Sequence, residues 1–99
     1  MIMYDVVNYI INNGSAEKPV MNHQISAHLH ISEVNVRKLI NKARCEGIPI
    51  CSCRKGYYHS NNKADILATI QSLNHRTISV EKAISGLLGN LIGLESEEE

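Results

Sequence analysis

The chain has no long hydrophobic run. Although 43% of its 99 residues are apolar, polar residues interrupt each apolar stretch well before the roughly 20 residues that a membrane-spanning helix needs. The N-terminus also lacks the basic segment, apolar core and small-residue cleavage site of a secretory leader. We therefore expect no membrane partner and a cytoplasmic location.

The chain also lacks a net charge, since ten Lys and Arg residues balance ten Asp and Glu residues. The charges are unevenly distributed, however. Residues 34–63 contain seven Lys or Arg and one acid, Glu46, whereas four of the ten acids lie in the last five residues. Because screening limits electrostatic contacts to about 8 Å at physiological salt, the local basic segment matters more than the neutral sum.

Cysteine is scarce, and the three present do not form a typical metal motif. Cys45, Cys51 and Cys53, with His59 nearby, would offer soft zinc ligands. The C-x-C spacing lacks the two-residue gap common in structural zinc sites, however, and no second paired motif follows. We interpret the cysteines as free thiols and expect no metal and no other cofactor.

The sequence contains no recognisable catalytic constellation. Five histidines are scattered at positions 23, 28, 30, 59 and 75 without a motif. Neither a carboxylate pair nor an activated nucleophile accompanies them. We therefore expect a protein that is not an enzyme.

The most specific pattern lies in residues 20–58 and predicts two helices joined by a three-residue turn. Asn22 can cap the first helix, in which Ile25 and Leu29 point inward. His30 occupies the turn position where such motifs usually have glycine. A left-handed backbone at this position would cost histidine more than glycine, although histidine is among the residues enriched in that conformation.

The second helix of the pair has a clear start and end. Ser32 can accept a hydrogen bond from an amide of the first turn, and Glu33 adds a favourable negative charge there. Gly47 ends the helix. Apolar residues recur at helical spacing and predict one buried stripe, formed by Val36, Leu39, Ile40 and Ala43.

The opposite face of this helix bears cationic and amide side chains, which suit base edges in a DNA groove. The residues predicted to contact bases are Val34, Arg37, Lys38 and Asn41. The alternative interpretation is an ordinary solvated helix surface.

A short β-hairpin is expected next. Residues 48–53 alternate, residues 54–56 form a basic turn, and residues 57–59 return as a second strand. Val20 can add a short edge strand. A basic turn is typical of a wing that lies along a phosphate backbone. The residues predicted to contact phosphates are Asn22, Ser32, Lys42, Arg44, Arg54, Lys55 and Tyr57.

Residues 29–47 resemble, without a gap, the recognition-helix segment of the biotin-operon-repressor type of winged helix, the HTH type 11 group. Residues 55–57 resemble the wing of that family, and residues 3–11 supply a first helix. The resemblance implies a mainly α fold with a small β-wing. It also implies sequence-specific binding to double-stranded DNA, as in small bacterial and phage transcription regulators or replication proteins. Nothing similar to the biotin-binding or ligase portion follows.

Two C-terminal helices are expected after the hairpin. The pair Asn61-Asn62 can cap a fourth helix, residues 74–77 interrupt it, and Ser79 caps a fifth. The apolar face of the fifth helix is wider than a small monomer core can use, which predicts a homodimer. The predicted interface residues are Ala83, Ile84, Leu87, Leu88, Leu91 and Ile92.

These elements predict three regions. Residues 1–60 form the winged helix-turn-helix domain, residues 61–94 the dimerising helices, and residues 95–99 an acidic disordered tail. Gly86, Gly89 and Gly93 recur within the last helix and allow two interpretations. They form either a seam where two helices approach closely or a short helix that breaks near Gly89.

Two functions from different classes remain. The first is a dimeric, sequence-specific DNA-binding regulator or replication protein, which the basic wing favours. The second is a phage-type inhibitor or adaptor that uses a winged-helix scaffold to block a host protein, which the neutral sum and the acidic tail favour. DNA binding should weaken steeply as salt rises, so a salt titration separates the two.

Overall fold

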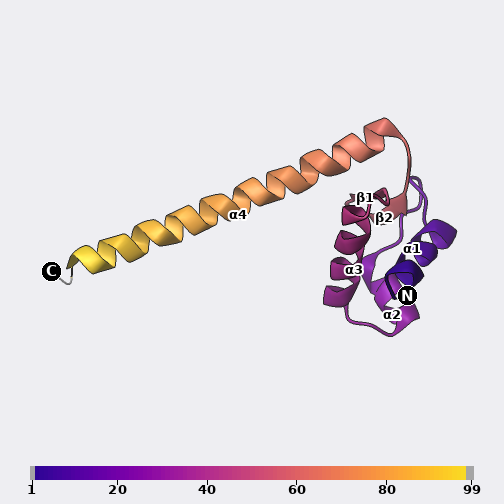
Figure 1. Cartoon of the computed structure of the whole chain (residues 1–99), viewed down its shortest axis with the longest axis horizontal. Helices are drawn as coiled ribbons and strands as arrows, with labels where there is room; N and C mark the ends of the chain where they lie inside the picture. Colours follow the sequence, from indigo (N-terminus) through magenta and orange to yellow (C-terminus); the bar gives the residue numbers. More distant parts are fainter. Residues whose placement is uncertain (1, 98–99) are drawn as a thin grey trace. The chain divides into compact units, whose positions relative to one another are not determined.

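The computed structural model describes the backbone of residues 2–97 and the side chains of residues 2–93 (Figure 1). Its elements in chain order are α1 (Ile2–Asn13), α2 (Asn22–Leu29), α3 (Glu33–Cys45), β1 (Ile50–Cys53), β2 (Gly56–His59) and α4 (Lys63–Glu97). The chain forms two units: the first extends to Thr69 and the second is the remainder of α4. A mainly helical chain with one small antiparallel sheet is thus confirmed.

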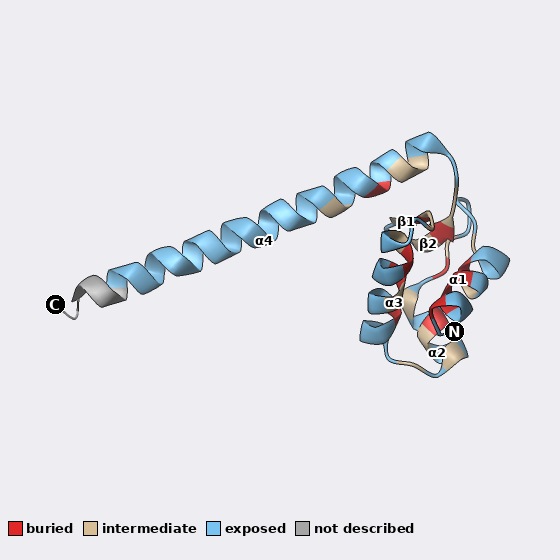
Figure 2. Cartoon of the chain, in the orientation of Figure 1, coloured by how far each residue is buried: buried red, intermediate tan, exposed pale blue. Residues whose placement is uncertain are grey.

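The core of the first unit lies between its helices. Figure 2 shows buried residues on the sides of α1 and α3 that face one another. The buried members of this core are Met3, Val6, Val7, Ile10, Val20, Ile25, Val36, Ile40, Ala43 and Ile50. Leu39 packs against them while half-buried, so the predicted apolar stripe of α3 is confirmed. Burial of each large apolar side chain contributes roughly 1.5–3 kcal/mol, which fixes the rotation of α3.

The turn between α2 and α3 has the predicted length of three residues. His30 adopts φ 57° and ψ 42°, the left-handed conformation. Ser26 Oγ donates a hydrogen bond to the carbonyl of Ile31 at 2.5 Å, which closes the turn. Ser32 Oγ accepts from the amide of Asn35 at 3.1 Å, so the predicted cap of α3 is confirmed.

The predicted cap of α2 is wrong. Met21 is the capping position, and its amide donates to Oε1 of Gln24 at 2.7 Å. Asn22 lies one residue inside the helix, where its Nδ2 donates to the carbonyl of Glu33 at 3.2 Å. Because this side chain bonds to the start of α3, it ties the two helices together instead of capping its own.

The predicted β-hairpin is present with different bounds and has a third, one-residue edge. Strand β1 begins at Ile50 instead of residue 48, and Gly56 belongs to β2 instead of the turn. Strands β1 and β2 pair antiparallel with Cys53 opposite Gly56, which leaves Arg54 and Lys55 exposed at the turn. Val20 pairs with Tyr57 through backbone hydrogen bonds of 2.9 and 2.7 Å. The hairpin is therefore attached to the segment before α2 as well as to α3.

Gly56 is required by this attachment, so Gly56→Ala should destabilise the first unit by about 2 kcal/mol or more. A Cβ there would lie 2.2 Å from the carbonyl oxygen of Val20, and φ is +132°. Gly47→Ala is the matched control, because Gly47 has φ +88° but nothing within 4 Å of the added carbon. Urea unfolding of both variants measures the difference. Equal losses would contradict a role for the contact with Val20.

The first unit extends further than residue 60 because the start of α4 is bonded to the hairpin. Asn62 Oδ1 accepts from the amide of Ala64 at 2.8 Å, as predicted for a cap. Thr69 is buried, and its Oγ1 accepts from the amide of Ser52 at 3.2 Å. Burial, and then the charge of Asp65, raise the pKa of the Tyr58 phenol. These contacts place the boundary after Thr69.

The predicted fourth and fifth helices are one helix. Residues 74–77 continue α4 without a break, since they include neither glycine nor proline, and Thr77 Oγ1 donates to the carbonyl of Leu73 at 3.2 Å. Residues 95–97 are helical instead of forming the expected disordered tail, whereas residues 98–99 lie outside the described residues. No helix in the described part combines the length and apolar character of a membrane span.

Candidate nucleic-acid interface

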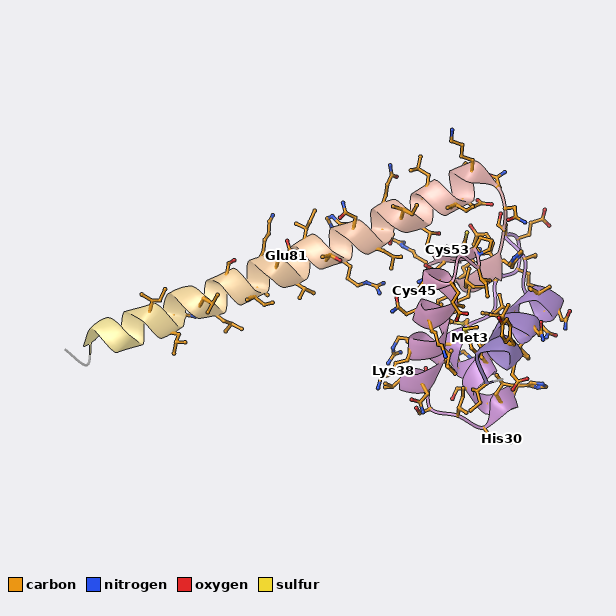
Figure 3. The ribbon with its side chains drawn as sticks, viewed as in Figure 1. Met3, His30, Lys38, Cys45, Cys53 and Glu81 are labelled. Atoms are coloured by element: carbon orange, nitrogen blue, oxygen red, sulfur yellow. The ribbon has the colours of Figure 1, made fainter. Side chains whose placement is uncertain are left out.

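The face of α3 opposite the core is exposed and chemically distinct. Val34 is 51% exposed, and the side chains of Arg37, Lys38 and Asn41 are also exposed. Figure 3 shows Lys38 on the side of α3 away from the buried Met3. The four predicted base-contact residues therefore share one accessible face.

The cations on this face are available to bind a partner. Arg37, Lys38 and Lys42 make no hydrogen bond or ion pair with any other residue that the structure describes. The hairpin turn adds Arg54 and Lys55, both exposed. Five cationic side chains thus extend from α3 and the hairpin turn of the same unit.

The neutral total conceals two units of opposite charge. Residues 1–69 contain eight Lys or Arg and five Asp or Glu, a formal net charge of +3. Residues 70–99 contain two Lys or Arg and five Glu, a net charge of −3. Neutrality of the whole chain is therefore no argument against an anionic partner for the first unit.

Arg44, a predicted phosphate contact, also makes contacts within the fold. Its Nε donates to the carbonyl of Ile50 at 2.8 Å, and a terminal nitrogen donates to Oγ of Ser52 at 3.2 Å. The guanidinium carbon also lies 6.0 Å from the centre of the Tyr57 ring. The rigid, planar guanidinium therefore joins α3 to the hairpin and orients both.

Three other predicted phosphate contacts also participate in the fold. The side chain of Asn22 bonds to the start of α3, and that of Ser32 caps the same helix. Tyr57 is half-buried against the core. These side chains position α3 and the hairpin, while Lys42, Arg54 and Lys55 remain exposed candidates for phosphate contact.

One residue on this face was not among the predicted contacts. Cys45 is an exposed free thiol, and it follows Lys38 by seven residues and Asn41 by four, which places all three on one side of the helix. Figure 3 shows Cys45 and Lys38 on the same side of α3. Helical spacing alone could have identified it. Cys51 is buried and Cys53 exposed, both as free thiols.

The histidines, cysteines and carboxylates do not assemble into a metal site in the described part of the chain, where no group of three lies close enough to hold an ion.

Comparison with models of known families, with curated proteins and with solved structures gives no match. Function is therefore inferred from the geometry and charge of the first unit.

Proposed function

We propose that residues 1–69 are a winged helix-turn-helix domain that binds double-stranded DNA sequence-specifically, as a transcription regulator or replication protein. The observation that carries the proposal is a row of four exposed residues on α3, namely Val34, Arg37, Lys38 and Asn41. The opposite side of the helix packs in the core. The basic hairpin turn of the same unit supports it. The resemblance of residues 29–47 to the biotin-operon-repressor type agrees with this arrangement.

Each side chain of the row suits a particular base feature. Arg37 and Lys38 can donate to O6 and N7 of guanine, and Asn41 can pair with N6 and N7 of adenine. Val34 lies in the first turn of α3, where a methyl group can contact the methyl of thymine. In helix-turn-helix proteins the N-terminal part of the recognition helix contacts base edges, and Val34, Arg37 and Lys38 lie in the first half of α3. Asn41 continues the same face one turn later, so we assign sequence reading to these four residues.

The remaining cations bind phosphates and set the position of α3. Arg54 and Lys55 form the turn of a hairpin that Arg44 attaches to α3. Lys42 flanks the row on the helix itself. Phosphate contacts fix register on the duplex but carry no sequence information. The bonds of Arg44 keep the base-contacting and phosphate-contacting groups in one rigid arrangement.

The proposal is tested by selecting bound duplexes from a random pool with the full chain. We expect an enriched motif, and affinity for it should fall log-linearly with salt. That duplex should also slow alkylation of Cys45, since the exposed thiol lies on the contacting face. A pool without enrichment would contradict sequence-specific binding and favour the alternative, a host protein as the partner.

The hairpin turn should contribute affinity without specificity. Replacing Arg54 and Lys55 together with Ala is expected to weaken binding to selected and unrelated duplexes by the same factor. It should also flatten the slope of log affinity against log salt by about two units. Lys18→Ala, which removes an exposed cation of the loop before α2, is the control. A change in the preferred motif would show that the turn reads bases.

A further inference from the structure

The second unit is a helix whose apolar side chains have no partner in the described chain. Every residue from 74 to 93 is exposed. The large apolar side chains among them are 43–68% exposed: Ile78, Val80, Ile84, Leu87, Leu88, Leu91 and Ile92. Helices in proteins are stabilised mainly by packing of an apolar face, and three glycines further weaken this one. The second unit therefore requires a partner.

The continuity of α4 aligns these side chains in a heptad repeat. Apolar residues, interrupted once by Thr77, recur at alternating steps of three and four, and the average of 3.5 residues defines a coiled-coil seam. The a positions are Ile70, Thr77, Ile84 and Leu91. The d positions are Leu73, Val80, Leu87 and Leu94. A break at residues 74–77 would have divided this seam, but the helix passes through them.

We propose that residues 70–94 form a parallel, two-stranded coiled coil with a second copy of this chain. The seam residues indicate the number of strands, because β-branched residues at a with Leu at d favour dimers. Three of the four a positions are Ile or Thr, and three of the four d positions are Leu. A second copy also presents the same 3.5-residue repeat, which knobs-into-holes packing requires of the partner.

Charge complementarity supports the parallel orientation. Arg76 is at a g position and Glu81 at the following e position, five residues later. In a parallel, in-register pair, a g residue meets the next e residue of the other helix. In the dimer, Arg76 of each copy would therefore lie beside Glu81 of the other copy, which gives two such contacts.

Thr77 fits the seam despite its hydroxyl. A polar group buried at an a position needs a hydrogen-bond partner, and Thr77 Oγ1 already donates to the carbonyl of Leu73 in its own helix at 3.2 Å. The hydroxyl can therefore enter the seam without losing a partner. Thr77 thus continues the repeat between Leu73 and Val80 without requiring a bond from the second copy.

The heptad register also decides where the glycines lie. Gly86, Gly89 and Gly93 occupy the outer positions c, f and c, and a Cβ added to any of them meets nothing within 4 Å. The seam of the proposed coiled coil therefore does not include them, and α4 continues through all three without the expected break near Gly89. Of the predicted interface residues, Ile84, Leu87 and Leu91 belong to the seam, Ala83 and Leu88 flank it, and Ile92 lies outside it.

The first experiment is sedimentation equilibrium of the full chain at micromolar concentration. We expect twice the 11.0 kDa chain mass, and a monomer for Leu87→Glu, whose first unit should unfold in urea as in the wild type. Gly89→Ala is the matched outer-face variant and should strengthen the dimer, because Ala favours helix. A monomeric or trimeric wild type would overturn the proposal, as would a weaker dimer in Gly89→Ala.

The second experiment tests orientation by charge reversal. Arg76→Glu and Glu81→Arg should each raise the dimer dissociation constant roughly threefold to tenfold, since each creates two like-charge contacts. The double reversal should restore the wild-type constant. A double variant weaker than either single variant would overturn the parallel arrangement. None of these outcomes depends on DNA binding, so the two proposals fail separately.

Discussion

Replacing Arg37 and Lys38 together with Ala is expected to abolish sequence-specific DNA binding while leaving the first unit folded. Both side chains are exposed and point away from the stripe that packs in the core. A good base contact contributes about 1–3 kcal/mol of discrimination, so losing two should reduce affinity for the selected duplex by a hundredfold or more. Titration of selected and scrambled duplexes at one salt concentration measures the loss.

Lys42→Ala is the matched control for the double variant, because Lys42 is an exposed cation on the same helix, at the edge of the row. It should weaken both duplexes alike, by the amount of one phosphate contact. Urea unfolding should show both variants as stable as the wild type. If the double variant kept its preference for the selected duplex, α3 would not be the reading helix.

A monomer should bind a duplex with two half-sites far more weakly than the dimer. Leu87→Glu places a charge in the proposed seam and is expected to reduce this affinity by about a hundredfold, because linked domains bind the second half-site at a high effective concentration. The slope of log affinity against log salt should also fall by about half, since one domain contacts half as many phosphates. Titrations over a salt series measure both effects.

A duplex with one half-site provides the control for this experiment. Wild type and Leu87→Glu should bind it equally, because the substitution lies in the second unit and α3 is unchanged. Unequal binding to the single half-site would mean that residues 70–94 contact DNA themselves. Equal binding of both proteins to the two-site duplex would mean that dimerisation does not contribute to affinity.

The neutral net charge of the whole chain hides the positive charge of the first unit. The basic first unit and the acidic second unit cancel in the sum, although each has a formal charge of magnitude three. A charged partner responds to the surface it approaches, because screening removes the influence of distant charges. The positive row on α3 and the hairpin turn can therefore attract phosphate in a chain with no net charge.

The amino-acid sequence by itself determined the features that depend on neighbouring residues. The cap at Ser32 and the apolar stripe of α3 were predicted and are present. A hairpin turn was predicted over residues 54–56, and the turn observed comprises Arg54 and Lys55. Each arises from interactions across a few positions, where spacing and side-chain type indicate the geometry. The exposed face of α3 could be predicted for the same reason, since the stripe defines its opposite side.

Only the tertiary structure decided the roles that depend on residues distant in the sequence. Asn22 bonds to the carbonyl of Glu33, eleven positions away, and Thr69 bonds to Ser52, seventeen positions away. Arg44 contacts the hairpin because the chain reverses after α3 and returns along it. The chemistry of a hydrogen-bonding side chain allows it to bind a ligand or to bond to another part of the protein. The choice is made by the packed backbone, which brings a distant carbonyl, amide or hydroxyl within reach.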